Sequence, residues 1–431
     1  MRYYSTKNKT AFVSLREAVL KGLPGDNGLF MPETIPSIPK QDLQQFPSWD
    51  QGEVAAYISQ KFLEGDVPDA MIRDIAEGAI NFEAPLVQLE DDLHVLELFH
   101  GPTLAFKDFG ARFMARLMAW LVRNDDQKLT ILVATSGDTG GAVASGFLGV
   151  EGIEVIILYP SGKVSPLQEK QLTTLGQNIT ALEIEGTFDD CQHLVKQAFL
   201  DKDLQDARRL TSANSINISR LIPQTFYYFH AATRNTLDKR PLIFSVPSGN
   251  FGNLCAGLMA QRMGAPIHRF IASTNVNDVV PEYLTRGVYN PRPSIRTISN
   301  AMDVGNPSNF WRLMDLYDHQ LKKVQQHLKG YTFSDDTTRA TMREIYDRFS
   351  YVIDPHGAVG YLGWKAFQDT HPGFQGVVLE TAHPSKFIEV VEEELPVKVS
   401  LPARLKVLAD RKKEAIQMPF AFEQFKAFLL A

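Results

Sequence analysis

The chain has 431 residues, of which 44% are hydrophobic and 22% are charged. This length exceeds what one hydrophobic core usually serves, so we expect more than one packed domain and a cleft between domains. The formal net charge of -6 argues against a nucleic-acid binder, because neutralising phosphates needs a clustered excess of lysine and arginine.

Cysteine usage and the first residues indicate where the protein works. The two cysteines, Cys191 and Cys255, are too few and too far apart for a disulfide framework or a thiolate metal site, which favours a reducing compartment. Residues 1–10 are polar and lack the apolar run of a secretory signal, and no later stretch is apolar for long enough to span a membrane. We therefore expect a cytoplasmic protein that binds no membrane.

The first part of the chain, to about Phe82, has helix-like spacing of apolar residues around a loop at 22–39 that is rich in glycine and proline. It predicts a small helical module. After Leu93, short β-branched runs alternate with helical patterns, and we expect strands at 129–134, 154–159, 179–184, 242–246 and 268–273. This alternation predicts an α/β fold with parallel sheets, in which ligands bind where strands end and helices begin. The segment after Pro396 is helical in pattern and predicts terminal packing helices.

The segment HGPTLAFKDFGARFM, residues 100–114, places Lys107 at the start of an amphipathic helix. The positive end of the helix dipole and the neighbouring Phe99, Phe106 and Phe109 would both lower the pKa of its amine. A neutral amine suits covalent attachment to a carbonyl cofactor. Taken alone, a solvated lysine beside a structural turn would be the commoner explanation.

Two further segments have the order strand, glycine-rich turn, helix: ATSGDTGGAVA at 134–144 and SVPSGNFGNLCAG at 245–257. Backbone N–H groups at a helix N-terminus bind phosphate without a cationic side chain. Neither segment has the residue order of a P-loop or of G-x-G-x-x-G, so an NTPase or a dinucleotide enzyme loses its strongest support. A different phosphate-bearing cofactor is therefore expected.

Together these segments resemble the threonine synthase family, within the tryptophan-synthase-β-like group of enzymes that use pyridoxal 5'-phosphate (PLP). The resemblance extends along the chain through GLPGDNGLFMPE (22–33), NSINISR (214–220), SNAMDV (299–304), DPHGAVGY (354–361) and TAHPSKF (381–387). It implies PLP fold type II, with two parallel-sheet α/β domains and a small, mainly helical N-terminal domain. The implied domains are residues 1–84, then a large PLP-binding domain of 85–108 and 236–431, and a smaller α/β domain of 109–235.

The resemblance also implies roles for single residues. Lys107 would be the Schiff-base lysine, Asp138 would lie close to the cofactor's ring oxygen, and Thr381 would face its pyridine nitrogen. A neutral hydroxyl there would make the ring a weaker electron sink than a carboxylate partner does. The cradle of the cofactor phosphate would be Ser248, Gly249, Asn250, Phe251 and Gly252.

The substrate implied by the resemblance is O-phospho-L-homoserine, converted with water to L-threonine and phosphate by γ-elimination and β-hydration, the last step of threonine biosynthesis. Such an enzyme is a carbon–oxygen lyase acting on phosphate, here expected as a monomer or homodimer. The substrate carboxylate would meet Thr135, Ser136 and Thr139. The leaving phosphate would meet Asn214, Ser215 and Arg220, whose planar fork suits phosphate oxygens, with Lys163 as a further partner.

Other interpretations stay open. A PLP-dependent phospho-lyase or dehydratase on phosphorylated hydroxyamino acids would carry the same cofactor segments, and a catalytically silent phosphate-binding protein would keep the same fold. His100, His356 and His383 each adjoin a motif, but the chain lacks H-E-x-x-H or similar ligand spacing, so no metal site is expected.

Overall fold

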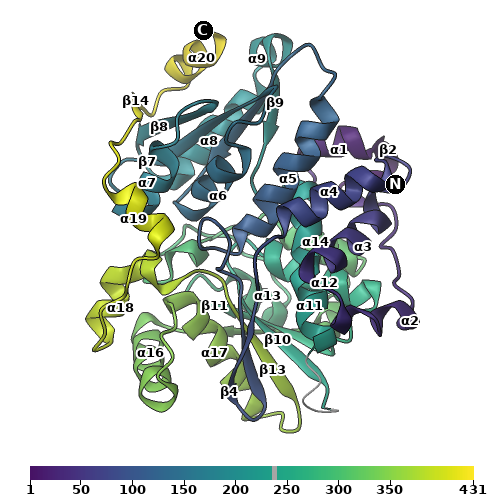
Figure 1. The fold of residues 1–431 in the computed structure, drawn as a ribbon, viewed down its shortest axis with the longest axis vertical. Coiled ribbons are helices and arrows are strands. Elements are labelled where there is room, and N and C mark those ends of the chain that lie inside the picture. Colours follow the sequence, from purple (N-terminus) through teal and green to yellow (C-terminus); the bar gives the residue numbers. More distant parts are fainter. Residues whose placement is uncertain (235–239) are drawn as a thin grey trace.

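The computed structural model describes residues 1–234 and 240–431, which form three sheets surrounded by helices (Figure 1). The six-stranded sheet occupies the lower half of the view and the five-stranded sheet the upper left. The N-terminal helices, in purple, pack along the right side, and the C-terminal α20 lies at the top. Within the described residues no helix has both the length and the apolar character needed to cross a membrane.

The N-terminal part is mainly helical, as predicted, but it also contains a small antiparallel sheet of order β2-β1-β3. β1 and β3 are too short for sequence alternation to reveal, and β2, of seven residues, is exposed along most of its length. The third helix begins with a capping box between Asp50 and Glu53, which satisfies N–H groups at both residues. Its elements are β1 Arg2–Ser5, β2 Asn8–Ser14, α1 Leu15–Lys21, β3 Phe30–Pro32, α2 Lys40–Leu43, η1 Phe46–Ser48, α3 Gln51–Leu63 and α4 Asp69–Ala79.

The five-stranded sheet is parallel throughout, in the order β14-β8-β7-β6-β9. Its strands are β6 Leu129–Ala134, β7 Ile153–Pro160, β8 Ile179–Glu185, β9 Arg209–Ser212 and β14 Ile416–Pro419. The helices that accompany it are α5 Lys107–Val122, α6 Asp138–Phe147, α7 Pro166–Thr173, α8 Phe188–Leu200, α9 Lys202–Ala207, α10 Ile218–Leu221, η2 Ile222–Gln224 and α20 Phe422–Leu430.

The six-stranded sheet, of order β12-β11-β10-β13-β5-β4, is parallel except for β4 at its edge. Its strands are β4 Leu86–Glu90, β5 Leu93–Glu97, β10 Leu242–Pro247, β11 Arg269–Thr274, β12 Leu328–Thr332 and β13 Gln375–Glu380. The remaining helices are α11 Thr225–Arg234, α12 Gly252–Met263, α13 Val279–Arg286, η3 Asn300–Met302, α14 Phe310–Leu316, α15 Leu321–His327, α16 Asp335–Phe349, α17 Pro355–Gln368, η4 Pro384–Phe387, α18 Ile388–Glu394 and α19 Ala403–Ala409.

The predicted α/β class with parallel sheets is confirmed, and all five predicted strands are present within two residues of their expected limits. One assignment needs correction: residues 236–431 do not all accompany the larger sheet, because β14 pairs with β8 at the edge of the smaller one. The stretch after Pro396 contains the predicted packing helices, α19 and α20, and also this strand, which the sequence did not predict. The expected limit at 235/236 lies outside the described residues, and the other domain limits stay predictions.

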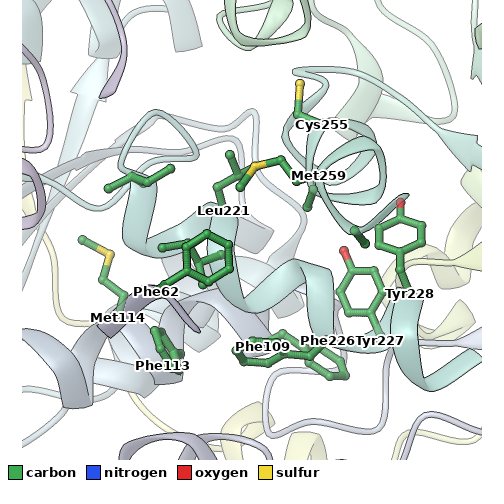
Figure 2. Packing of buried hydrophobic residues seen from close by; sticks show 14 of the residues in the cluster. Phe62, Phe109, Phe113, Met114, Leu221, Phe226, Tyr227, Tyr228, Cys255 and Met259 are labelled. Atoms are coloured by element: carbon green, nitrogen blue, oxygen red, sulfur yellow. The ribbon is translucent and has the colours of Figure 1, made fainter. Parts of the chain in front are cut away.

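Alternate residues of the same strand enter different cores, which places helices on both faces of each sheet. In β6, Ile131 and Val133 join the largest core, whereas Leu132 packs with α8 and α20 on the opposite face. The largest core also includes Phe62 of the N-terminal part, beside Phe113 of α5 (Figure 2). The N-terminal helices and both sheets therefore share one continuous apolar interior.

Candidate active site

A cavity of about 1830 Å³ lies where the carboxyl ends of β6 and β10 meet the loops that follow them. This is the position expected for a ligand site in parallel α/β sheets. Every residue predicted to contact cofactor or substrate lines this cavity: Lys107, Thr135, Ser136, Asp138, Thr139, Lys163, Asn214, Ser215, Arg220, Ser248, Gly249, Asn250, Phe251, Gly252 and Thr381. The structure thus brings together segments that are far apart in the sequence, while their roles stay predictions.

Lys107 is the first residue of α5, as its motif predicted. Its Nζ lies 3.6 Å from Oδ2 of Asp138 and 5.0 Å from the ring centroid of Phe106. Burial lowers the pKa of the amine, Asp138 opposes this, and the positive charges of Lys386 and Arg220 lower it further. The surroundings therefore favour a neutral amine.

Thr381 follows β13 and is joined to the lysine segment through the backbone. The N–H of Phe106 donates to the carbonyl oxygen of Thr381 at 2.9 Å, and Ala105 forms an antiparallel bridge with Ala382. Because these contacts flank Lys107, they fix the position of Thr381 relative to the lysine in the cavity wall.

The predicted phosphate cradle lies between β10 and α12. Phe251 adopts a left-handed backbone with φ of 60°, and α12 begins at Gly252, so the first N–H groups of this helix lack intrahelical partners. A Cβ at Gly249 would stand 2.7 Å from Cα of Met302, so only glycine fits this approach. Ser248 is already engaged: its N–H donates to Ser273 O at 2.9 Å and its hydroxyl to Val246 O at 2.8 Å. The available donors of the turn are therefore those of residues 249–252.

The second glycine-rich turn leads from β6 into α6. Oγ1 of Thr135 accepts from the N–H groups of Gly137 and Gly140 at 2.9 and 2.8 Å, so this hydroxyl shapes the turn and retains its own O–H for a ligand. Gly137 has a φ of 138°, which an L side chain rarely adopts. Ser136 is exposed at the turn, and Thr139 lies in the first turn of α6.

Arg220, in the segment NSINISR, lies in the wall of the cavity. Its residue exposure is 3%, its Nη1 donates to Ala213 O at 2.5 Å, and its Nε has no hydrogen-bond partner among the described residues. Burial lowers the pKa of the guanidinium to about 10, so it remains charged at neutral pH. An unpartnered donor on a buried cation favours an anionic ligand beside it.

The other residues predicted to contact the leaving phosphate differ in their hydrogen bonds and exposure. Ser215 Oγ accepts from Nδ2 of Asn250 at 2.8 Å and of Asn309 at 3.2 Å, which links it to the glycine-rich turn before α12. Asn214 donates to Ala134 O at 3.0 Å. Lys163 is exposed in the loop between β7 and α7, so it lies at the rim of the cavity.

Comparison with known proteins decides the family. Residues 82–379 match the family described as pyridoxal-phosphate dependent enzyme, residues 2–80 the threonine synthase N terminus, and residues 357–429 the threonine synthase C-terminal region. The threonine synthases of Serratia marcescens and Escherichia coli K12 are each 44% identical, covering 100% of this chain and 99% of theirs. This chain belongs to the threonine synthase family.

Solved structures of threonine synthases agree with this assignment. The Escherichia coli threonine synthase structure has a TM-score of 0.93 at 43% identity, and the PLP-bound threonine synthase of Brucella melitensis 0.92 at 35%, each covering 100% of this chain and 99% of its own. Maize serine racemase, at 16% identity with a TM-score of 0.55 over 73% of this chain and 92% of its own, shares the fold alone. As a member of the threonine synthase family, the chain is a PLP-dependent enzyme.

The cavity fits PLP by its own chemistry. Lys107 supplies an amine whose pKa is lowered, as attachment of an aldehyde requires. The start of α12 supplies N–H donors of the kind that bind a phosphate, and Gly249 lets the turn before it pack against Met302. Thr381 lines the same cavity, so one space holds the three groups predicted to contact PLP.

Lys386 was not among the site residues predicted from the sequence, although it lies in the segment TAHPSKF. Its side chain is fully buried, with Nζ 2.6 Å from Oδ1 of Asp138. The same oxygen accepts from Nε2 of Gln168 at 2.7 Å. These contacts hold the pKa of Asp138 well below its usual range in spite of burial. A lysine so close to the predicted Thr381 could have been recognised as a candidate for the site.

A second missed residue, Arg312 of α14, supports the backbone of the segment NSINISR. Its buried guanidinium donates to the carbonyl oxygens of Ser215, Ile216 and Phe30, which joins NSINISR to the N-terminal sheet. Burial lowers the pKa of Arg312 to about 10. We interpret it as a structural cation rather than a ligand contact.

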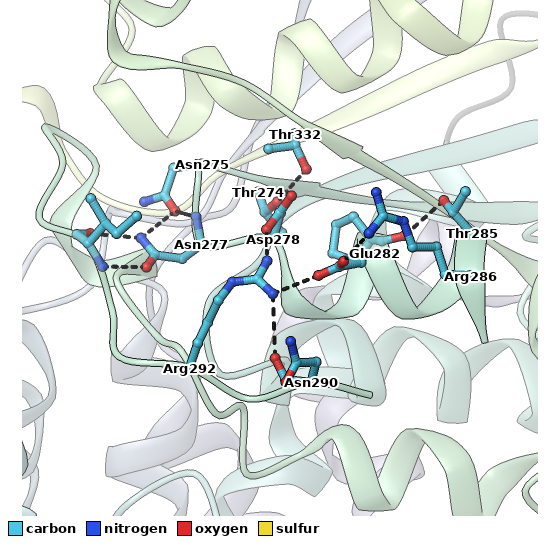
Figure 3. A network of polar contacts seen from close by, with 12 residues as sticks. Thr274, Asn275, Asn277, Asp278, Glu282, Thr285, Arg286, Asn290, Arg292 and Thr332 are labelled. Carbon is cyan, nitrogen blue, oxygen red and sulfur yellow. Dashed lines mark hydrogen bonds and ion pairs between the residues drawn. The ribbon is translucent and has the colours of Figure 1, made fainter. Parts of the chain in front are cut away.

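The loop before η3 closes one side of the cavity through a polar network (Figure 3). Arg292 is paired with Asp278 and with Glu282, the latter at 2.6 Å. Oδ1 of Asn277 accepts from the N–H of Ile295 at 2.7 Å. These contacts hold a loop with little regular structure against α13.

The three histidines that adjoin motifs each contact neighbouring groups of the chain. His356 pairs its Nδ1 with Asp354 at 2.8 Å and accepts the N–H of Ala301 on Nε2 at 3.2 Å, which holds η3 beside Gly249. His100 contacts Glu97, and His383 contacts Ser385. Among the described residues, no group of three His, Cys, Asp or Glu side chains is arranged to hold a metal ion.

Proposed function

We propose that this chain converts O-phospho-L-homoserine and water to L-threonine and phosphate with PLP as its cofactor. The proposal rests on Arg220, a buried cation that lines the same cavity as Lys107 and whose Nε has no hydrogen-bond partner in the described part of the chain. A PLP enzyme acting on an unphosphorylated amino acid would have no use for a second buried anion site beside the lysine. Full-length identity of 44% to threonine synthases supports the same reaction.

PLP, when bound, withdraws electrons from Cα of the substrate and makes the protons on Cα, and in turn on Cβ, removable. Lys107 would hold the cofactor, and its free Nζ would take and return the proton at Cα of the substrate. Its lowered pKa suits a base that must be neutral before it accepts a proton. Thr381 would offer the cofactor's ring nitrogen a neutral hydroxyl.

The leaving phosphate needs positive charge aimed at the oxygen of the breaking Cγ–O bond. Arg220 supplies this from a position where water is excluded, so its charge acts in a low dielectric. Asn214 and Ser215 supply neutral polar contacts at the same end, and Lys163 adds a cation at the rim.

The substrate carboxylate lies at the turn before α6 in this proposal. Thr135, Ser136 and Thr139 present hydroxyls there, and the N-terminal end of α6 favours a negative charge. Two anion sites in the same cavity as Lys107 would fix both ends of the substrate, with Cα and Cβ held near Nζ.

The proposal includes a cytoplasmic location, supported by two buried free cysteines, and a monomeric or homodimeric state. Light scattering of the purified protein measures that state.

A product assay with O-phospho-L-homoserine tests the function. Purified protein loaded with PLP is expected to form threonine and phosphate in equal amounts, and Lys107→Ala is expected to form neither. Phosphate accompanied by a 2-oxo acid and ammonia, without threonine, would instead identify a phospho-lyase.

A further inference from the structure

Lys386 and Asp138 form a buried ion pair that joins the two sides of the cavity. Lys386 belongs to η4, after the last strand of the larger sheet, and Asp138 begins α6, after the first strand of the smaller one. Nζ of Lys386 lies 2.6 Å from Oδ1 of Asp138 and donates to the carbonyl oxygen of Thr103 at 2.9 Å. The side chains of Lys386 and Asp138 are 0% and 5% exposed, so water screens their charges little and these act strongly on neighbouring groups.

The most exposed neighbour of this pair is Lys107, whose Nζ is 3.6 Å from the other oxygen of Asp138. One carboxylate therefore lies between two lysines. The closer one, Lys386, is completely buried, whereas the Lys107 side chain keeps 17% exposure towards the cavity. Lys386 is consequently the stronger ion-pair partner of the Asp138 carboxylate.

We propose that Lys386 is a positioning residue that engages Asp138 and keeps the nitrogen of Lys107 uncharged under working conditions. Without Lys386, the Asp138 charge would act on Lys107 alone and stabilise its protonated form. This inference deepens the proposed function, because the reaction needs a neutral nitrogen on Lys107 both to hold the cofactor and to act as a base.

The other charges around Lys107 support this division of roles. Arg220 of α10 contributes a second positive charge that lowers the pKa of Lys107. Asp108, next to Lys107 on α5, is directed away, since its carboxylate accepts from the N–H and the hydroxyl of Thr103 at 2.8 and 2.7 Å. Burial raises the pKa of Asp108, which weakens it as a counter-charge. Asp138 is thus the carboxylate with the strongest effect on the charge of the Lys107 nitrogen, and Lys386 weakens this effect by pairing with Asp138.

The test is a pH titration of the visible absorbance of the bound cofactor, in the loaded protein without substrate. In Lys386→Met the midpoint is expected to rise by roughly one pH unit, a tenfold change in proton affinity, because a nearby positive charge has been removed. In Asp138→Asn it is expected to fall. The double variant is expected to lie between the two single variants. This readout does not depend on which substrate is turned over, so failure of the proposed reaction would leave it intact.

Two further variants separate charge from packing. Gln168→Leu removes a hydrogen bond to the same oxygen of Asp138 without removing a charge, so its midpoint is expected to move much less than that of Lys386→Met. Lys386→Arg keeps the charge and is expected to stay close to the parent protein. The acid limb of the pH profile of kcat/KM should follow the same order.

The proposal is overturned if Lys386→Met loses cofactor or stability while its midpoint stays where it was, since that is the behaviour of a purely structural lysine. It is equally overturned if Lys386→Met and Asp138→Asn shift the midpoint in the same direction. Should Lys386→Met fail to fold, the comparison of Asp138→Asn with the double variant carries the same test, because removing Lys386 must again raise the midpoint.

Discussion

Gly110 of α5 lies against the guanidinium of Arg220: a Cβ at Gly110 would stand 2.8 Å from Nε and 3.0 Å from the backbone oxygen of Arg220. Gly110→Ala is therefore expected to displace the one buried cation proposed for the substrate phosphate. We expect kcat/KM to fall at least about tenfold, with roughly 1–3 kcal/mol of lost stability. Ala111→Gly, at the next position of α5, is the control: it should cost stability by about 1 kcal/mol and leave KM close to that of the parent. Equal kinetics for Gly110→Ala and the parent would contradict this prediction.

Arg220 itself provides a second prediction. Arg220→Lys keeps a positive charge but loses the planar fork, and a lysine buried there is more easily deprotonated. We expect kcat/KM to fall about a hundredfold and inhibition by inorganic phosphate to weaken, as measured by steady-state kinetics. Lys163→Met, at the exposed rim, is the comparison and should lose less than about tenfold. A larger loss in Lys163→Met would move the phosphate site to the rim.

Much of the cavity was predictable because its residues lie in local patterns that physics makes recognisable. A buried strand, a glycine-rich turn and a small-residue helix lead to Gly249 or to Gly137, and a lysine at a helix start leads to Lys107. These local patterns do not show which residues far apart in the sequence lie close together in space. Nothing local to Lys386 reveals that η4 folds back onto α6, because that ion pair depends on how the two sheets are placed.

The same reason explains the errors in the fold. β14 pairs with a strand of the other sheet, a contact set by the path of the chain after α19. The pattern after Pro396 is dominated by the helical spacing of α19 and α20, which conceals a short exposed strand between them. Arg312 was missed likewise, since its carbonyl partners come from two segments that are far apart in the chain, Phe30 and residues 215–216.

A buried carboxyl gives a prediction on stability. A Cβ at Gly357 would stand 1.5 Å from Oε2 of Glu380, which is fully buried at the end of β13. Gly357→Ala is expected to cost about 3 kcal/mol or more, because α17 and β13 cannot separate without opening the core. Urea denaturation measures this cost. Gly25→Ala, where nothing lies within 4 Å of the added Cβ, should change stability little, and similar losses for both variants would contradict the predicted clash.

His230 of α11 predicts a dependence of stability on pH. Burial, with a smaller effect of Arg234, lowers the pKa of His230 from 6.5 to about 4. His230 binds a proton more readily in the unfolded chain than in the folded one. This histidine therefore does not reduce the free energy of unfolding above pH 6.5, and it reduces that free energy as the pH falls from 6.5 towards 4. The loss is on the order of 3 kcal/mol. Unfolding by urea at several pH values should show a smaller acid loss in His230→Gln than in the parent, whereas exposed His319→Gln should behave as the parent; identical acid profiles for all three would refute the assignment.

The most direct test of the proposed reaction follows isotopic oxygen. In the proposed reaction, phosphate leaves by cleavage of the Cγ–O bond and water adds at Cβ. In ¹⁸O-labelled water the label is therefore expected in the hydroxyl of threonine and not in phosphate. Mass spectrometry of both products measures this. Label in phosphate together with unlabelled homoserine would mean that water attacks phosphorus, and it would contradict the account.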